Sequence, residues 1–214
     1  MDIIIFIIPT IGRDSLSKSI DSLINLECNN TWKALIIFDG VKNNIPNFTH
    51  KNIIFIEIEK CGNIDLKNNA GLVRNYGLNY IINNNIKSKY IGFLDDDDTL
   101  HPNYINNLCN EEKNFEFDCI IFRMMFPNYK IVPHQLTNKI QRCNVGISFA
   151  LKYDIIYNNK YRFINNAFED YIFLIILKKD KKKILLLKYI NYFVKTDYNK
   201  CKSYIRNYPN ILFN

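Results

Sequence analysis

The first half of the chain alternates between short, continuous apolar runs and longer stretches in which apolar residues recur every three or four positions. Continuous runs are typical of strands buried on both faces, and the wider spacing is typical of helices packed against them. The pattern predicts strands at residues 3–8, 32–38, 52–58 and 90–94, and helices at 14–26 and 70–82. We expect Asp14 or Ser15 to cap the first helix. The inward stripe of the second helix consists of Ala70, Val73, Gly77 and Ile81.

Beyond residue 104 the apolar segments become shorter and less regular. They predict a short helix at 104–108, strands at 119–125, 130–132 and 145–151, a helix at 167–178, a strand at 184–194 and a short outer helix from residue 199. Strands that alternate with helices form a mostly parallel sheet with helices on both faces. We therefore predict an α/β fold with a mixed central sheet, in a single domain that spans residues 1–214.

Polar residues directly follow three of the predicted strands. Pro9 and Thr10 come after the first strand, Asp39 ends the second, and Asp95 follows the fourth. In sheets of this kind, ligands bind beyond the carboxyl ends of the strands. We expect these residues to meet at one edge of the sheet and to form a binding site there.

Four consecutive aspartates, Asp95 to Asp98, leave the strand at 90–94. Two unit charges about 4 Å apart repel by roughly 1 kcal/mol in water and about 4 kcal/mol at an intermediate dielectric. A bound divalent cation with oxygen ligands would offset this repulsion. The alternative is a solvated acidic turn in which Asp98 caps a helix that starts near Pro102.

Composition describes an ordinary globule, with 214 residues, 48% hydrophobic and 23% charged residues. The net charge of +7 allows attraction to anions, but the cations are scattered, and no aromatic-basic motif predicts nucleic-acid binding. The basic run Lys178–Lys183 is expected to be a solvated turn; weak contact with an anionic or membrane surface is the alternative. Heavy use of Ile, Asn, Lys and Tyr suits an AT-rich genome, such as a low-GC or viral one.

The six cysteines form no CxxC pair, so a zinc site is not expected. Several lie in apolar segments, as reduced core thiols do, which favours a reducing compartment. The N-terminal apolar run is too short for a signal sequence, and no stretch approaches the length of a membrane span. We expect a soluble, cytoplasmic protein.

Five segments, in order along the chain, resemble the inverting glycosyltransferases of the GT-A fold, broadly family 2. They look like the family's opening strand and PT…R turn, its second strand, its donor-side helix, its DxD motif and its ED pair, and they lie at residues 7–13, 36–40, 69–78, 94–98 and 168–171. The resemblance implies a nucleotide-sugar-binding half at 1–100 and an acceptor-binding half at 101–214. It also implies metal-dependent transfer of a sugar from a nucleoside-diphosphate sugar, UDP-linked, to a hydroxyl of a glycan or similar acceptor.

The resemblance assigns roles to individual residues on the donor side. Asp97 would be the main ligand of Mn²⁺ or Mg²⁺, with Asp95 as a further ligand, and the metal would act as a Lewis acid on the departing diphosphate. The donor itself would contact Pro9, Thr10, Arg13, Asp39, Arg74, Asp95 and Asp96. Two of these have structural alternatives, since Asp39-Gly40 is a common turn and Arg74 fits an exposed helix position.

The resemblance makes Asp170 the catalytic base, with Glu169 as its orienting partner. A base that removes the acceptor's proton in a single displacement inverts the anomeric configuration. The alternative is that both residues simply favour the first turn of a helix electrostatically. Residues 144–148 are expected to line part of the acceptor site. The family's C-terminal metal-binding histidine has no counterpart, since no histidine follows His134.

Three other readings of the sequence stay open at this stage. Asp95-x-Asp97-x-Thr99 fits the nucleophile motif of haloacid-dehalogenase-type phosphatases, although that motif normally ends the first strand. A sugar nucleotidyltransferase shares the metal and the sheet but opens with a Gly-rich basic loop, of which residues 9–13 are a poor version. A non-catalytic binding module is the third.

Overall fold

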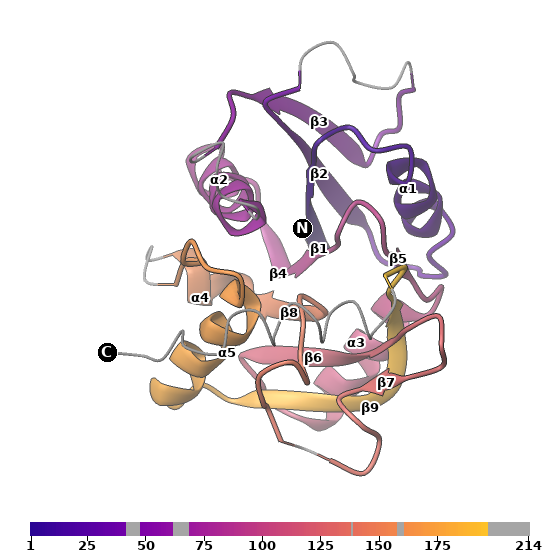
Figure 1. The fold of residues 1–214 in the computed structure, drawn as a ribbon, viewed down its shortest axis with the longest axis vertical. Helices are drawn as coiled ribbons and strands as arrows, with labels where there is room; N and C mark the ends of the chain where they lie inside the picture. Colours follow the sequence, from indigo (N-terminus) through magenta and orange to yellow (C-terminus); the bar gives the residue numbers. More distant parts are fainter. Residues whose placement is uncertain (42–47, 62–68, 138, 158–160, 197–214) are drawn as a thin grey trace.

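The computed structural model describes residues 1–41, 48–61, 69–137, 139–157 and 161–196. Its strands form one nine-stranded sheet in the order β3-β2-β1-β4-β8-β6-β9-β5, with β7 paired to β6 (Figure 1). The strands are β1 (Asp2–Thr10), β2 (Trp32–Asp39), β3 (Ile53–Ile58), β4 (Ser88–Phe93), β5 (Thr99–Leu100), β6 (Cys119–Met125), β7 (Ile131–Val132), β8 (Phe149–Lys152) and β9 (Ile184–Phe193). The helices are α1 (Leu16–Ile24), α2 (Ala70–Asn83), α3 (Tyr104–Asn114), α4 (Tyr153–Tyr157) and α5 (Glu169–Lys179).

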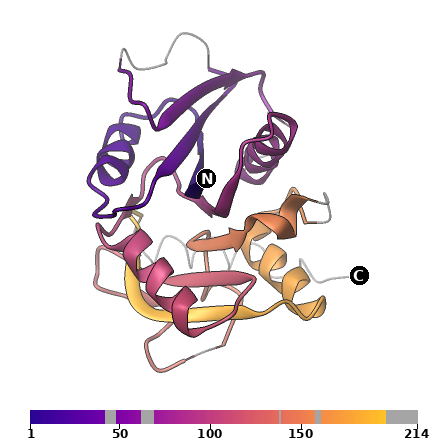
Figure 2. The same ribbon diagram turned by 180° about the vertical axis from the view of Figure 1, so that it is seen from behind.

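The sheet changes character at its centre. Strands β1 to β4 are parallel to one another, with Ile8 paired to Ile36 and Ile4 paired to Tyr90. Strand β8 then runs antiparallel to both β4 and β6, whereas β9 lies parallel to β6 and antiparallel to β5. The two helices of the first half, α1 and α2, flank the β1–β4 layer on opposite sides (Figures 1 and 2). The carboxyl ends of β1, β2 and β4 therefore point to one edge.

The apolar runs form the core because both faces of the parallel strands are covered. Residues 4–8 of β1 and 34–38 of β2 are fully buried. Helix α2 packs directly on these strands, and Gly77 permits the close approach, since a Cβ there would lie 2.8 Å from Ile7 Cγ2 and 2.9 Å from Ile37 Cδ1. The close packing fixes where α2 begins, and its first turn lies beside the sheet edge.

The predicted strands of the first half are confirmed, and several details of the second half differ. Helix α3 continues to Asn114, whereas the sequence suggested an end near residue 108. The strand expected at 145–151 forms only from Phe149, and both α4 and the two-residue β5 were missed. The outer helix expected from residue 199 lies outside the described residues. The single-domain assignment stays a prediction.

Two predicted caps are wrong. Ser15 occupies the position before α1, but its side chain makes no capping hydrogen bond. Asp98 does not cap a helix near Pro102, because α3 is preceded by Asn103 and the Asp98 carboxylate instead accepts a hydrogen bond from the Lys195 amide at 3.0 Å. Within the described ranges, no helix is long and apolar enough to cross a membrane.

Candidate active site

A cavity of about 560 Å³ lies at the carboxyl edge of the parallel strands. The ends of β1, β2 and β4, the start of α2 and the first turn of α5 all contribute to its wall. The lining residues are Pro9, Thr10, Ile11, Arg13, Asp39, Lys60, Asn69, Ala70, Val73, Arg74, Asp95, Asp96, Asp97, Glu169 and Thr196. The fold thus brings together every predicted donor-side residue, as well as Glu169 from the other end of the sequence.

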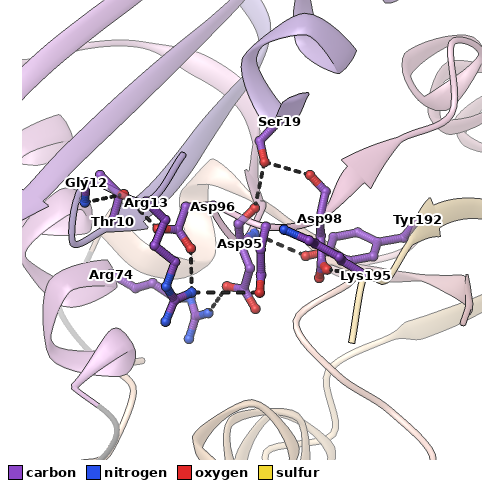
Figure 3. A network of polar contacts seen from close by, with 11 residues as sticks. Thr10, Gly12, Arg13, Ser19, Arg74, Asp95, Asp96, Asp98, Tyr192 and Lys195 are labelled. Atoms are coloured by element: carbon purple, nitrogen blue, oxygen red, sulfur yellow. Dashed lines mark hydrogen bonds and ion pairs between the residues drawn. The ribbon is translucent and has the colours of Figure 1, made fainter. Parts of the chain in front are cut away.

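Asp96 ties the turn after β1 to the aspartate segment. Thr10 Oγ1 donates to Asp96 Oδ2 at 2.7 Å, and the Arg13 guanidinium donates to Asp96 Oδ1 at 2.8 Å (Figure 3). Thr10 Oγ1 in turn accepts the amide of Gly12, whose φ of 79° is the left-handed conformation that glycine tolerates. Because Asp96 is buried and its two carboxylate oxygens are bonded in this way, it holds the turn in place.

The neighbouring carboxylates of Asp95 and Asp97 reach the cavity. Their side chains are 35% and 27% exposed, against 5% for Asp96. Burial raises the pKa of Asp97, and the carboxylates of Asp95 and Asp96 raise it further, against the opposing charges of Arg13 and Lys195. The negative charge is therefore crowded at the cavity wall, where a bound cation would stabilise it.

Asp39 lines the cavity at the end of β2. Its Oδ1 accepts the amide of Cys61 at 2.6 Å, and its Oδ2 pairs with Lys60 Nζ at 3.0 Å. The carboxylate is buried and fixed by these two contacts. It is held rigidly enough to act as a directional acceptor for a ligand that reaches this side.

Arg74 is a buried residue of α2 that connects two acidic groups. Its guanidinium donates to Glu169 Oε1 at 2.9 Å and also to Asp95 Oδ1. Burial lowers the pKa of Arg74, but the carboxylates of Asp95 and Glu169 raise it by more, so the guanidinium stays charged. The reading of Arg74 as an exposed helix arginine is wrong, since only 2% of the residue is accessible.

Asp170, the predicted base, follows Glu169 but does not line the cavity. Its Oδ1 accepts the amide of Tyr171 at 2.6 Å, and a Cβ on Gly146 would lie 3.6 Å from its Oδ2. Burial and the Glu169 carboxylate together raise the pKa of Asp170 to about 7. A carboxyl group with this pKa exchanges a proton readily near neutral pH. The Gly146 contact places part of the 144–148 segment beside it.

The aspartates offer a partial ligand set for a divalent cation. Among the described residues, no group of three or more histidine, cysteine, aspartate or glutamate side chains is arranged to hold a metal. Two partly exposed carboxylates, those of Asp95 and Asp97, are present at the cavity. Oxygen donors suit Mg²⁺ and Mn²⁺, which commonly complete their coordination with phosphate and water. The residues thus fit a metal that is held jointly by protein and ligand.

Sequence reasoning missed several residues of the site. Lys60 and Thr196 line the cavity, and Tyr192 and Ser19 support the aspartates from outside it. Lysine and threonine in surface segments of a lysine-rich chain carry no distinguishing signal. Tyr192 lies within an apolar strand pattern that predicts only core packing, so its hydroxyl contact could not be foreseen.

The arrangement of the fold and of the site is that of the GT-A class. Its features are a parallel half with acidic strand ends, an antiparallel centre and an acidic pair brought in by α5. Residues 5–185 match the profile of Glycosyl transferase family 2, and the chain therefore belongs to this family. Membership leaves the phosphatase and nucleotidyltransferase readings without support.

Among curated proteins, the chain is similar to poly(ribitol-phosphate) beta-N-acetylglucosaminyltransferase TarP of Staphylococcus aureus, with 28% identity over 215 residues. The match covers 90% of this chain and 60% of TarP, so the chain spans only part of this relative's length.

Solved structures agree on the fold. S. aureus TarS 1–349 in complex with UDP-GlcNAc has a TM-score of 0.68 at 14% identity, covering 91% of this chain and 58% of that chain. Mannosyltransferase PcManGT from Pyrobaculum calidifontis, in complex with GDP-Man and Mn²⁺, has a TM-score of 0.62 at 10% identity, covering 87% and 55%.

Proposed function

We propose that this protein transfers a sugar from a UDP-linked donor to a hydroxyl group of a glycan or a similar polyol acceptor, with inversion at the anomeric carbon. The observation that carries the proposal is the single cavity in which the ends of three parallel strands and the first turn of α5 bring Asp39, Asp95, Asp97 and Glu169 together. A nucleotide binds at such an edge, and its diphosphate needs positive charge close to the acidic segment.

UDP-N-acetylglucosamine is the donor that we propose to test first. The similar TarP is named as an N-acetylglucosaminyltransferase, and TarS has been solved both with UDP-GlcNAc and with UDP. The cavity's volume of about 560 Å³ falls in the range of small-molecule sites. Asp39, fixed by Lys60 and the Cys61 amide, would accept hydrogen bonds from the base, and Arg13 would approach the diphosphate.

Asp97 and Asp95 would hold a Mn²⁺ or Mg²⁺ ion together with the donor's phosphates. The ion would supply Lewis-acid stabilisation of the departing diphosphate. The presence of Mn²⁺ together with GDP-Man in the structure of the similar mannosyltransferase supports this part of the proposal. The guanidinium of Arg13 lies 3.8 Å from Asp97 Oδ2. It would therefore provide a second positive charge beside the departing diphosphate. Arg74 has a different role, because its guanidinium is bonded to Asp95 and Glu169, and it would orient both rather than contact the donor.

Asp170 would take the proton of the acceptor hydroxyl as that oxygen attacks the sugar. The pKa near 7 means that an appreciable fraction is ionised at neutral pH, while the group still binds a proton strongly enough to act as a base. Glu169, paired with Arg74, would fix the first turn of α5 and so the position of Asp170. Displacement by an acceptor on the face opposite the diphosphate inverts the anomeric centre.

A donor screen tests the proposal directly. UDP-, GDP- and dTDP-sugars, each with and without Mn²⁺, are added to the protein and thermal unfolding is followed; a ligand at 100 times its Kd stabilises by about 2.7 kcal/mol. We expect UDP-linked donors with Mn²⁺ to give the largest shift. The anomeric configuration of the product is then read by NMR.

Matched variants separate catalysis from binding. Asp97→Asn should weaken donor binding, Asp170→Asn should abolish transfer while donor binding persists, and the exposed Asp154→Asn in α4 should change neither. A donor that binds without any transfer, with Asp170→Asn silent, would instead indicate a binding module. A retained configuration would contradict the single displacement.

Two coarser expectations about the whole protein remain proposals. The described cysteines, five in number, are all free thiols, which supports a reducing, cytoplasmic location. The basic run lies between α5 and β9, where Lys178, Lys179 and Lys181 are exposed and Lys183 pairs with Glu116. Weak contact between this run and an anionic surface stays a prediction.

A further inference from the structure

Tyr192 contacts the aspartate segment but is not among the residues that line the cavity. It belongs to β9 and is fully buried. Its hydroxyl accepts a hydrogen bond from the Asp95 amide at 3.1 Å (Figure 3), and it also interacts with the Asp98 carboxyl group. One hydroxyl thus contacts both the first and the last aspartate of the four.

Two further contacts hold the same segment. The Lys195 amide donates to Asp98 Oδ1 at 3.0 Å, and Ser19 Oγ of α1 lies 2.7 Å from the Asp98 carbonyl and 3.3 Å from that of Asp95. The Asp98 amide also bonds to the Asp95 carbonyl at 3.2 Å, which closes a tight turn. Asp98 therefore faces inward and is buried, while Asp95 and Asp97 face the cavity.

This arrangement opposes the electrostatic tendency of the segment. Consecutive carboxylates repel one another, so an unsupported turn would spread them apart. A hydrogen bond in a buried site is costly to leave unmade, because the freed amide and carboxylate have no water to replace it. The Tyr192 hydroxyl connects the two ends of the turn, so its loss would release both together.

We propose that Tyr192 is a positioning residue that fixes the turn of Asp95–Asp98, so that the carboxylates of Asp95 and Asp97 converge at the cavity. It acts through the backbone of Asp95 and the side chain of Asp98 and does not touch the donor. Its consequence for ligand binding rests on the proposed function, whereas its effect on the turn is independent of any ligand.

Tyr192→Phe tests this inference, since it removes the hydroxyl and keeps the ring. Tyr104→Phe is the matched control: Tyr104 is also fully buried, and within the described part of the chain its hydroxyl has no hydrogen-bond partner. Hydrogen exchange of the unliganded protein is measured for a peptide spanning residues 94–99 and for one within β1. We expect Tyr192→Phe to accelerate exchange at 94–99 about tenfold, leaving β1 unchanged, and Tyr104→Phe to leave 94–99 as in the wild type.

The second measurement is donor binding and turnover. Tyr192→Phe should raise the Kd for UDP with Mn²⁺ and the donor KM about tenfold, with the acceptor KM unchanged, and Tyr104→Phe should match the wild type. Unchanged exchange at 94–99 in Tyr192→Phe, or equal exchange in both variants, would overturn the inference whatever the ligand. If exchange responds as expected but the wild type binds no nucleotide, the proposed function fails and the structural role of Tyr192 stands. If the wild type binds and Tyr192→Phe binds equally well, the functional part of the inference is wrong.

Discussion

At the scale of single residues, Arg74 connects the elements that form the site. It is buried in α2, and its guanidinium joins Asp95, at the end of β4, to Glu169, at the start of α5. It also lies 5.6 Å above the ring of Phe163. A guanidinium with several fixed donors suits this bridging position, which a lysine ammonium could not fill in the same way.

Replacing Arg74 by methionine should destabilise the protein by about 3 kcal/mol or more, because the buried Glu169 carboxylate loses its cation. The contrasting change Lys33→Met removes a lysine that is 38% exposed and that pairs with the partly exposed Asp2, and we expect a loss of less than about 1 kcal/mol. Urea unfolding measures both. Equal losses for the two variants would show that the Arg74 bridge does not stabilise the fold.

The pH dependence of stability tests the environment of Asp170. With a pKa of about 7 in the folded protein and an ordinary value when unfolded, the folded state retains a proton that the unfolded state has released at intermediate pH. Stability therefore falls as pH rises between about 4 and 7. Asp170→Asn removes this loss. The variant should match the wild type near pH 4 and exceed it by roughly 1–2 kcal/mol at pH 8, after allowance for partial solvation.

Thermal unfolding of both proteins across this pH range provides the measurement, and transfer activity should rise with an apparent pKa near 7 in the wild type alone. A constant difference between the two proteins at all pH values would contradict a raised pKa at Asp170. The exposed Asp154→Asn again serves as the control and should follow the wild-type curve throughout.

The sequence predicted the acidic residues of the site better than their supports. Asp39, Asp95 and Asp97 directly follow strands, so their position at one edge can be inferred from chain order alone. The burial of Arg74 could not, because an arginine in a helical pattern is normally solvated, and only the fold brings Glu169 to it from 95 positions away. Contacts between distant segments leave no local pattern.

At the scale of elements, α2 packs closely on the sheet at Gly77. Gly77→Ala would add a Cβ 2.8 Å from Ile7 Cγ2 and 2.9 Å from Ile37 Cδ1. Alanine is favoured over glycine in a helix by about 1 kcal/mol, but overpacking costs about 1–3 kcal/mol. We expect a net loss of up to about 2 kcal/mol by urea unfolding.

The exposed end of the same helix supplies a control. Asn83→Ala, at the last position of α2, should change stability by less than about 0.5 kcal/mol. A Gly77→Ala variant that is more stable than the wild type would mean that the helix shifts away from the sheet easily. The donor cavity would then be less rigid than proposed, because Arg74 belongs to the same helix.

The long parallel strands and α2 were predicted, whereas the short elements β5 and α4 were missed, for a physical reason. The strands β1 and β2 are continuous apolar runs, and α2 has apolar residues every three or four positions. Both patterns arise because a buried face must be apolar along its length. The missed elements, β5 and α4, contain two and five residues, too few to show a clear period. The pairing of β6 with β9 also contains register shifts near Arg123, which no alternation in the sequence encodes.

At the scale of the whole molecule, one sheet runs through both predicted halves. The junction is the antiparallel pair β4–β8, where Ile91 lies opposite Leu151. The side chains of Phe93 and Phe149 also meet there, with ring centroids 5.3 Å apart. Two halves that share a sheet and a core in this way are expected to unfold together.

A comparison of two probes tests this expectation. The chain has one tryptophan, Trp32, which is buried in β2 and reports only on the first half. Far-UV circular dichroism reports on the whole chain. The two urea transitions should coincide within error, with one midpoint and one slope. A fluorescence transition that precedes or follows the dichroism would divide residues 1–100 from the remainder and contradict a single domain.

The position of Tyr192 in the chain also has a consequence for biosynthesis. Asp95 precedes Tyr192 by 97 residues. When β4 first emerges from the ribosome during synthesis, neither Tyr192 nor the Lys195 amide is yet present to hold the four aspartates in place. Affinity for the donor should consequently emerge only late in translation, once β9 has left the exit tunnel. Nascent chains on ribosomes stalled before β9 emerges would contain a partly folded sheet that does not bind nucleotide.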